Sequence, residues 1–538
     1  MSTNLPFLLK LSVAGAVILS VGACKPADKG QGALKSEGIA ALNLSKSESG
    51  VFSKYFKTEP CEVDEMEALG ALAGLGLGES GVNGVSFASR EVSGSRVRYS
   101  GLEMREDGAE ETAFSAKSVV FHCPKMGDEA PSFDRVDLTN IVIFDAAEDV
   151  KVTAKTLNVA NPSYAAARSI VESMTKPDTT SMEDSGFGAI SMTGAKMTSP
   201  EFNGTLAALS WGKTQDETGR GKADLTLDDF KLTLAGKDGT QDMDLTFGGM
   251  SARNLAISDT MDARSAMSAN GVMESVIGNL NAFQKPYDEL VVEKMNVDSE
   301  GFSLNFGGIE GKTTEKSGVI TTRQSLLPTQ IQLKPALGDA PNFQRNYNIL
   351  KTLGFETMNM SGSSVTTLNS DEDSISVSDG LFVIEDAMRL NFEYQAEGLG
   401  AMKEKMQTLQ AEGAGADAMA AYDALKLKGF RMTMEDNSIV ERGLKLAAEM
   451  TGQSETMIKR SLGMAVFAAA MAAENEVQAE VYSETMEAFA DFVKKGGTLT
   501  IEANPPAPFP LAPLITGKGE DIDPATLGFS ASQGGGVE

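Results

Sequence analysis

The most reactive side chains of this 538-residue chain are three cysteines, Cys24, Cys61 and Cys123, and its single histidine, His122. A zinc site built from cysteine and histidine needs more ligands than these residues supply, so we predict no metal and no cofactor. His122 stands beside Cys123, and an imidazole beside a thiol or a serine hydroxyl can act as a catalytic base. We expect His122 to be a surface or packing residue, and catalytic use stays open as the weaker alternative.

The first 23 residues have the layout of a secretory signal. Lys10 precedes an apolar run over residues 11–22, and small residues follow before Cys24. A run of about a dozen apolar residues is too short to span a bilayer, which takes roughly 20. We therefore predict that residues 1–23 are removed and that the chain is exported.

The residues Val21, Gly22, Ala23 and Cys24 resemble the bacterial lipobox. The resemblance implies that the Cys24 thiol carries a diacylglycerol and that the new amino terminus is acylated, which would bind the protein to a membrane through covalent lipid. Lys25 follows Cys24, where some enteric lipoproteins carry an aspartate that retains them in the inner membrane. By that analogy we expect an outer-membrane lipoprotein facing the periplasm. The inner membrane, the cell surface and an ordinary signal peptide with a chance cysteine stay open.

Cys61 and Cys123 remain as a pair after Cys24 is lipidated. An even number of cysteines in an oxidising compartment most simply forms a disulfide. Closing a loop of this length stabilises a fold by about 4 kcal/mol in the chain-entropy account. We predict a Cys61–Cys123 disulfide.

Composition excludes some partners. The formal net charge of −28 argues against binding nucleic acid and against adhesion to anionic lipid surfaces. Hydrophobic residues make up 41% of the chain, enough for a substantial core.

Alternation of apolar and polar residues dominates the first two thirds of the chain and predicts an antiparallel meander with interspersed helices. We expect strands at residues 96–104, 113–121, 136–144, 150–159, 224–227, 230–234, 242–247, 374–377 and 381–384, a hairpin turn at 378–380, and helices at 66–81, 162–175 and 261–283.

One short segment recurs. The sequence of residues 244–250, DLTFGGM, returns as SLNFGGI at residues 303–309. We interpret this as imperfect repetition of a strand, turn, strand and helix unit of about 90 residues. Chance similarity among glycine-rich strands is the alternative.

Helical patterns follow residue 398. We predict helices at residues 401–410, 417–426, 438–450, 454–473 and 477–495, then a strand at 498–503 and a proline-rich strap at 504–513. Methionines at 450, 457, 464 and 471 are spaced by seven. Soft thioethers can bind copper, but without partner histidines or cysteines we expect core packing.

The predicted fold class is α+β: an elongated, curved antiparallel sheet built from imperfect strand–turn–strand–helix repeats, with a helical C-terminal region. The predicted segments are residues 1–23 (signal peptide), 24–60 (lipidated tether), 61–285 (disulfide-linked β-rich region), 286–398 (further β-rich repeat), 399–495 (helical region), 496–515 (final strand and strap) and 516–538 (disordered tail).

Three local patterns match part of a known binding motif but lack the flanking elements or the residue spacing that the motif needs. The glycines at 76, 78 and 81 match GxGxxG, but here the expected helix precedes them. Gly212, Lys213 and Thr214 match only the end of a phosphate-binding loop. The carboxylates of residues 369–373 and of Asp228 and Asp229 lack EF-hand spacing, so we expect solvated turns, with weak calcium binding as the alternative.

The C-terminal third resembles a group of uncharacterised alphaproteobacterial exported proteins in the segments LGFETMNMSG at 353–362, NSIVERGL at 437–444 and GTLTIEANPP at 497–506. This resemblance implies placement in the cell envelope. The strand-rich pattern is also similar, more distantly, to β-groove proteins of the AsmA and YdgA kind, which are associated with envelope lipid homeostasis.

These residues specify no reaction, and we expect a non-catalytic scaffold or binding module whose partner is an envelope protein or a lipid. One alternative is a carrier that shelters an apolar ligand in a β-groove. It predicts contiguous apolar residues on a concave sheet face that no helix covers. The other alternative is a periplasmic hydrolase, which needs a pocket where His122 or paired carboxylates converge.

Overall fold

The computed structural model describes residues 52–58, 60–82, 84–105, 111–127, 130–145, 149–165, 167–168, 187–215, 221–236, 243–256, 285–339, 343–411, 424–461, 476–511 and 524–535. Cys24 and the predicted signal peptide lie outside these residues. The described residues fall into two compact units. The N-terminal unit holds those up to 256 and residues 289–299, and the C-terminal unit holds residues 285–288 and those from 300 onward.

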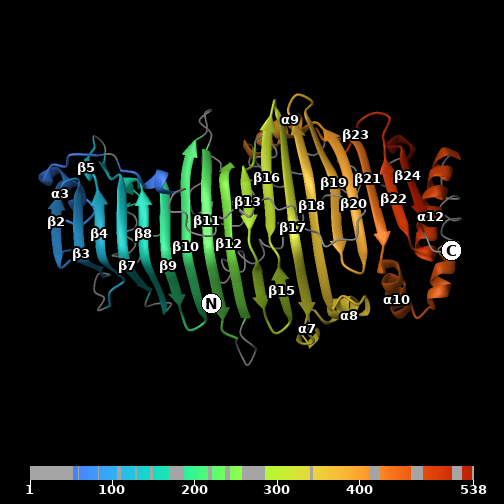
Figure 1. Ribbon diagram of the computed structural model, residues 1–538, viewed down its shortest axis with the longest axis horizontal. Coiled ribbons are helices and arrows are strands. Elements are labelled where there is room, and N and C mark those ends of the chain that lie inside the picture. Colours follow the sequence, from blue (N-terminus) through green and yellow to red (C-terminus); the bar gives the residue numbers. More distant parts are fainter. Residues whose placement is uncertain are drawn as a thin grey trace, which may run out of the picture. The chain divides into compact units, whose positions relative to one another are not determined.

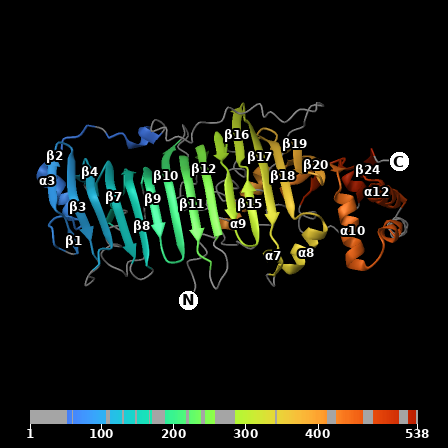
Figure 2. The same ribbon diagram turned by 60° about the horizontal axis from the view of Figure 1, so that its bottom comes forward.

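The N-terminal unit is an antiparallel sheet in which consecutive long strands pair with one another (Figures 1 and 2). The predicted meander is confirmed. Its elements are η2 (Lys54–Phe56), α3 (Glu65–Ala73), β1 (Val85–Ser86), β2 (Ser89–Ser93), β3 (Arg96–Met104), β4 (Phe114–His122), β7 (Arg135–Asp145), β8 (Val150–Ala160), β9 (Ala189–Thr198), β10 (Phe202–Gln215), β11 (Gly221–Leu234), β12 (Met243–Ala256), β13 (Glu289–Val292) and β14 (Met295–Asp298), with β5 (Lys125–Met126) and β6 (Pro131–Ser132) as a separate pair.

The strands of the C-terminal unit are antiparallel as well, and helices lie at the edges and on one face of this unit (Figure 1). The α+β class is therefore confirmed. Its elements are β15 (Phe302–Phe306), β16 (Ile309–Lys316), β17 (Val319–Leu333), α7 (Ala336–Asp339), α8 (Gln344–Thr352), β18 (Thr357–Asn369), β19 (Ser374–Ile384), β20 (Met388–Glu397), α9 (Leu399–Ala411), β21 (Lys426–Asp436), α10 (Ile439–Thr451), α12 (Glu476–Lys495), β22 (Thr498–Ala503), β23 (Phe509–Pro510), η5 (Pro524–Leu527) and β24 (Phe529–Gly534).

The predicted hairpin turn at residues 378–380 is wrong, because β19 runs through it. Asp379 has a φ of 56°, and the pairing of β19 with β20 shifts register between Val377 and Gly380. Gly380 packs so closely on the backbone of Phe392 that a Cβ would overlap the Phe392 carbonyl oxygen. An aspartate–glycine pair supplies a positive φ to a β-bulge as readily as to a turn.

Two strand predictions in the N-terminal unit are merged for a similar reason. Residues 224–227 and 230–234 belong to one strand, β11, with Asp229 at a φ of 44° between them. Asp228 and Asp229 therefore lie in a strand and not in the solvated turn that we predicted.

The C-terminal region contains more strand than its sequence indicates. The predicted helices 401–410, 438–450 and 477–495 correspond to α9, α10 and α12, but β21 lies between the first two. The predicted disordered tail is wrong for residues 529–534, since β24 pairs with β22 along its whole length. The predicted helices at 162–175, 261–283, 417–426 and 454–473 fall largely outside the described residues, which leaves the 90-residue repeat a prediction.

The methionine stripe is not core where it is described. Met450 is 63% exposed and Met457 is 59% exposed. Gly452 ends α10 in a left-handed conformation, so the helix does not continue in line from one methionine to the next. Met464 and Met471 lie outside the described residues.

Candidate functional site

Each sheet has one apolar and one polar face, because successive residues of a strand point to opposite sides. In the N-terminal unit Leu209 of β10 lies opposite Leu227 of β11, and Trp211 lies opposite Leu225. The intervening position is polar: Ser210 lies between Ser191 of β9 and Thr226 of β11. We name the two sides the apolar face and the polar face of each unit.

The apolar face of the N-terminal unit continues from strand to strand. Its rows are large aliphatic, aromatic and methionine side chains, and most are half-buried. The half-buried members are Leu138, Ile143, Val152, Leu157, Val159, Ile190, Met192, Met197, Leu206, Leu209, Leu227, Phe230, Phe247 and Met250.

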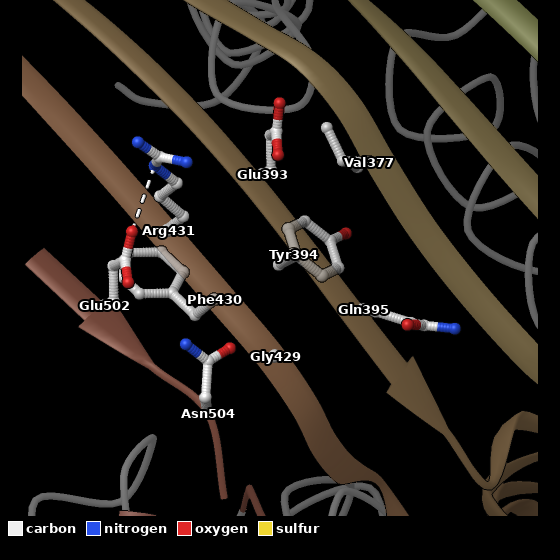
Figure 3. Close-up of a pocket in the computed structure, with 9 residues that line it drawn as sticks. All are labelled: Val377, Glu393, Tyr394, Gln395, Gly429, Phe430, Arg431, Glu502 and Asn504. Atoms are coloured by element: carbon white, nitrogen blue, oxygen red, sulfur yellow. Dashed lines mark ion pairs between the residues drawn. The ribbon is translucent and has the colours of Figure 1, made fainter. Parts of the chain in front are cut away.

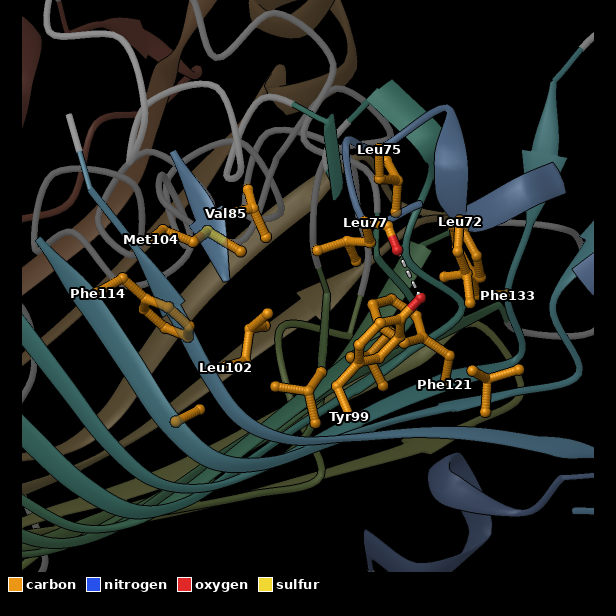
Figure 4. Packing of buried hydrophobic residues seen from close by; sticks show 14 of the residues in the cluster. Leu72, Leu75, Leu77, Val85, Tyr99, Leu102, Met104, Phe114, Phe121 and Phe133 are labelled. Atoms are coloured by element: carbon orange, nitrogen blue, oxygen red, sulfur yellow. Dashed lines mark hydrogen bonds between the residues drawn. The ribbon is translucent and has the colours of Figure 1, made fainter. Parts of the chain in front are cut away.

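A line of irregularities crosses this sheet at one level. In each of β3, β7, β9 and β11 one residue is not paired with the neighbouring strands and has a positive φ. These residues are Gly101 (60°), Asn140 (48°), Gly194 (60°) and Asp229 (44°). An unpaired residue with a positive φ disrupts the ladder locally and bends the strand. Figure 4 shows the strands bending, with the labelled apolar side chains on the inner side of the bend.

One end of this face is filled by the chain itself. Leu72 of α3 and the following Leu75 and Leu77 are at most 3% exposed and pack on residues of β3, β4 and β7. Tyr99 donates a hydrogen bond of 2.9 Å from its hydroxyl to the carbonyl oxygen of Leu77 (Figure 4), and its burial raises its pKa. Beyond this cluster most of the row residues are half-buried, while Trp211, Leu225, Leu232 and Leu245 are at most 8% exposed.

The apolar face of the C-terminal unit follows the same alternation. Phe392 of β20 lies opposite Met432 of β21, which lies opposite Ile501 of β22. Its half-buried members are Phe302, Leu304, Leu326, Ile331, Leu333, Met358, Met360, Phe382, Ile384, Leu390, Phe392, Met432, Met434 and Ile501.

Helices pack against two parts of this second face. Leu399 and Met402 of α9 contact Ile320 and Leu368. Ala488 and Phe492 of α12 pack with Leu499 of β22. The strap beyond β22 joins the first cluster, because β23 pairs with β21 and Leu511 packs beside it.

The polar face of the C-terminal unit is a ladder of amides, hydroxyls and charged groups. Asn305 donates to Gln330, which donates to Asn359, at 3.4 and 3.0 Å. A shallow depression of about 410 Å³ lies over β20, β21 and β22 (Figure 3). Glu393, Gln395, Asn504 and the Arg431–Glu502 ion pair at 3.2 Å line it.

The segment before α3 is fixed to the polar face of the N-terminal unit. Lys54 and the hydroxyl of Tyr55 both contact Asp224 Oδ2, at 2.8 and 2.9 Å, and the Asn254 amide donates to Oδ1 at 2.9 Å. The Tyr55 ring packs over Gly212, where a Cβ would collide with it. Burial, and then the negative charge of Asp224, raise the pKa of Tyr55. Gly212, Lys213 and Thr214 thus lie within β10 and not in a phosphate-binding loop.

His122 is a packing residue. Its side chain is 7% exposed, its Nε2 lies 2.8 Å from Asp137 Oδ2, and Arg135 Nε lies 2.5 Å from Asp137 Oδ1. The neighbouring Cys123 forms the predicted disulfide with Cys61, their Cα atoms 6.1 Å apart. The thiol beside His122 therefore cannot serve as its nucleophile.

Two of the carboxylates singled out in the sequence, Asp229 and Asp373, have structural partners, and Asp229 lies 3.1 Å from Lys231 Nζ. Asp373 Oδ1 accepts a 2.6 Å hydrogen bond from the Gly400 amide in the first turn of α9. The pKa of Asp228 is raised by burial and by the nearby charge of Glu293. No group of three or more potential metal ligands from His, Cys, Asp and Glu lies together within the described residues.

The glycines of the GxGxxG match follow α3 and precede β1, the reverse of a dinucleotide site. None of the helices in the described part of the chain is long and apolar enough to cross a membrane.

Sequence reasoning missed the continuity of the apolar faces and the contact of Tyr55 with Asp224. The continuity of the faces could be recognised from the period-two alternation, because each irregular residue exchanges the odd and even positions that face the apolar side. The second joins residues 169 positions apart and has no local signal.

A family model described as an uncharacterized protein matches residues 381–533, from within β19 to β24. The match agrees with the resemblance of the C-terminal third to an uncharacterised family, and it spans under a third of the chain. No curated protein matches the chain.

Proposed function

We propose that this protein is a lipid-anchored, non-catalytic binding module of the cell envelope that holds acyl chains on the apolar faces of its sheets. The observation that carries the proposal is the run of half-buried apolar side chains over β7–β12 and over β15–β21. Anchoring through Cys24 in the outer membrane, facing the periplasm, is part of the proposal and rests on the lipobox resemblance.

The chemistry of the faces favours an extended apolar ligand. Leucine, isoleucine, methionine and phenylalanine line them, and methionine adapts to ligands of irregular shape. In the N-terminal unit the half-buried rows cross six strands from β7 to β12, about 24 Å at the usual strand spacing. That length suits an acyl chain lying across the strands. The carrier of a lipid in a β-groove is thus the form of binding module that we favour.

A hydrolase is less well supported. His122 is buried against Asp137, and Cys123 is bound to Cys61. Tyr394 and the Arg431–Glu502 pair at the polar depression offer hydrogen bonds but no activated nucleophile.

Trp211 gives the proposal a direct test, because it is the chain's one tryptophan and lies on the apolar face between Ile190 and Leu225. Trp211 itself is 2% exposed. We therefore expect 9,10-dibromostearate, whose bromine atoms quench indole fluorescence over a short range, to lower Trp211 emission from the adjacent half-buried row of Leu209 and Leu227. Stearate is the matched ligand without bromine. Equal emission with both ligands would overturn acyl-chain binding at this face.

Purification identifies the natural occupant. The full-length lipoprotein, extracted gently and analysed by mass spectrometry, should carry stoichiometric lipid beyond its covalent anchor. A stoichiometric envelope protein without such lipid would instead support the scaffold alternative.

The proposed lipid attachment at Cys24 can be tested separately. Cys24→Ala should move the protein from the membrane to the soluble periplasmic fraction, because the thioether-linked lipid supplies the stable attachment. Fractionation with immunoblotting measures this, and Lys25→Ala should stay with membranes. Recovery of Cys24→Ala in the membrane fraction would contradict the predicted mode of anchoring.

A further inference from the structure

A belt of uncharged polar side chains interrupts the apolar face of the C-terminal unit. Thr313, Thr322 and Thr366 lie opposite one another on β16, β17 and β18, and Gln324 lies opposite Ser364 in the next row. Tyr287 packs over Gly311, and its hydroxyl accepts a 2.6 Å hydrogen bond from Gln324 Nε2. We name these six residues the polar belt.

The belt separates two apolar parts of the same face. On one side lies the cluster of Ile320 and Leu368 under α9. On the other side lie Leu326, Ile331 and Met360, where the half-buried rows begin.

Burying the hydroxyl and amide groups of the polar belt destabilises the fold unless each group has a hydrogen-bond partner. Thr313 and Ser364 are each 2% exposed, and Tyr287 is 1% exposed. Thr313 and Thr322 share a 3.1 Å hydrogen bond, but Ser364 Oγ has no hydrogen-bond partner in the described structure. An unpaired buried hydroxyl destabilises the fold, so an apolar residue would be the more stable choice here if packing were all that mattered.

We propose that the polar belt binds the uncharged polar part of an acyl lipid, the ester carbonyls and free hydroxyl of a diacylglycerol, with Ser364 donating to the ligand. The proposal rests on the proposed binding of acyl chains and adds the class of headgroup. Serine, threonine, glutamine and tyrosine supply hydrogen bonds without charge, which matches an ester or hydroxyl better than a phosphate. The half-buried rows that begin at Leu326, on the side that α9 does not occupy, then receive the acyl chains.

Ser364→Ala tests the polar belt, because loss of a ligand contact would lower lipid affinity, whereas loss of a structural contact would lower the melting temperature. In the full-length chain carrying Cys24→Ala, we expect the affinity for dioctanoylglycerol, measured by titration calorimetry, to fall 5- to 10-fold. The melting temperature of the ligand-free protein should stay equal or rise, since an unpaired buried hydroxyl is removed. Ser363→Ala, the neighbouring position on the opposite face, is the matched control and should leave both quantities unchanged.

Equal dioctanoylglycerol affinity for Ser364→Ala and its parent would overturn the belt proposal, as would absence of dioctanoylglycerol binding by the parent. Quenching of Trp211 by dibromostearate reports on the N-terminal unit and is independent of Ser364. If quenching persists while dioctanoylglycerol fails to bind, acyl-chain binding stands and the headgroup assignment falls.

Discussion

Leu206→Glu should lower acyl-chain binding to the N-terminal unit at least 10-fold, measured as the dibromostearate concentration that half-quenches Trp211. Leu206 is half-buried on the apolar face, opposite Ala195 of β9 and Phe230 of β11. A bound chain would cover the new carboxylate and remove it from water. Such desolvation costs well above the 1.4 kcal/mol that corresponds to a tenfold change.

The control for this change is the adjacent residue. Thr205 is exposed on the polar face, between Lys196 and Lys231. Thr205→Glu introduces the same charge on the same strand beside two cations, so binding should be unchanged. Leu206→Ala separates folding from binding, because it removes contact area without adding charge. If Leu206→Glu binds dibromostearate as tightly as Thr205→Glu does, the apolar face is not the acyl site.

Much of the strand pattern could be predicted because alternation is a local signal. Residues 96–104 and 498–503 were expected as strands and match β3 and β22 to the residue. The alternation also fixes which side chains share a face, so the apolar rows follow from sequence within each strand. Where a bulge interrupts a strand, as at Asp229 and Asp379, the phase flips, and aspartate or glycine there imitates a turn.

β21 shows a second limit. Its Phe430, Met432 and Met434 alternate with Arg431 and Thr433, but it is bracketed by strongly helical sequence and contains two methionines, which favour helix. Pairing with β20 and β22 overrides that local preference. Long-range strand pairing is therefore what decides this segment.

The polar belt could not be predicted from the sequence at all. Thr313, Gln324 and Ser364 are unremarkable strand residues, and they meet only because the registers of β16, β17 and β18 align them. A shift of one residue in either pairing would turn one of them to the opposite face. Their chemistry is thus a property of the register and not of any motif.

The second large effect concerns the disulfide. Replacing both Cys61 and Cys123 by serine should lower the free energy of unfolding of the N-terminal unit by about 4 kcal/mol, given their sequence separation of 62. The bond sits where the chain passes from Lys54 and Tyr55 on the polar face to α3 on the apolar face. Without it, the unfolded chain gains conformational freedom while the folded contacts remain.

Denaturant unfolding followed by Trp211 fluorescence measures this change, because Trp211 belongs to the affected unit. Wild-type protein treated with a reductant should unfold at the same lowered denaturant concentration, while Cys24→Ala, which keeps the disulfide, should unfold like the parent. An unchanged unfolding midpoint in the double variant would mean that the contacts of Asp224 and α3 hold the segment without the bond, and that the disulfide serves another purpose.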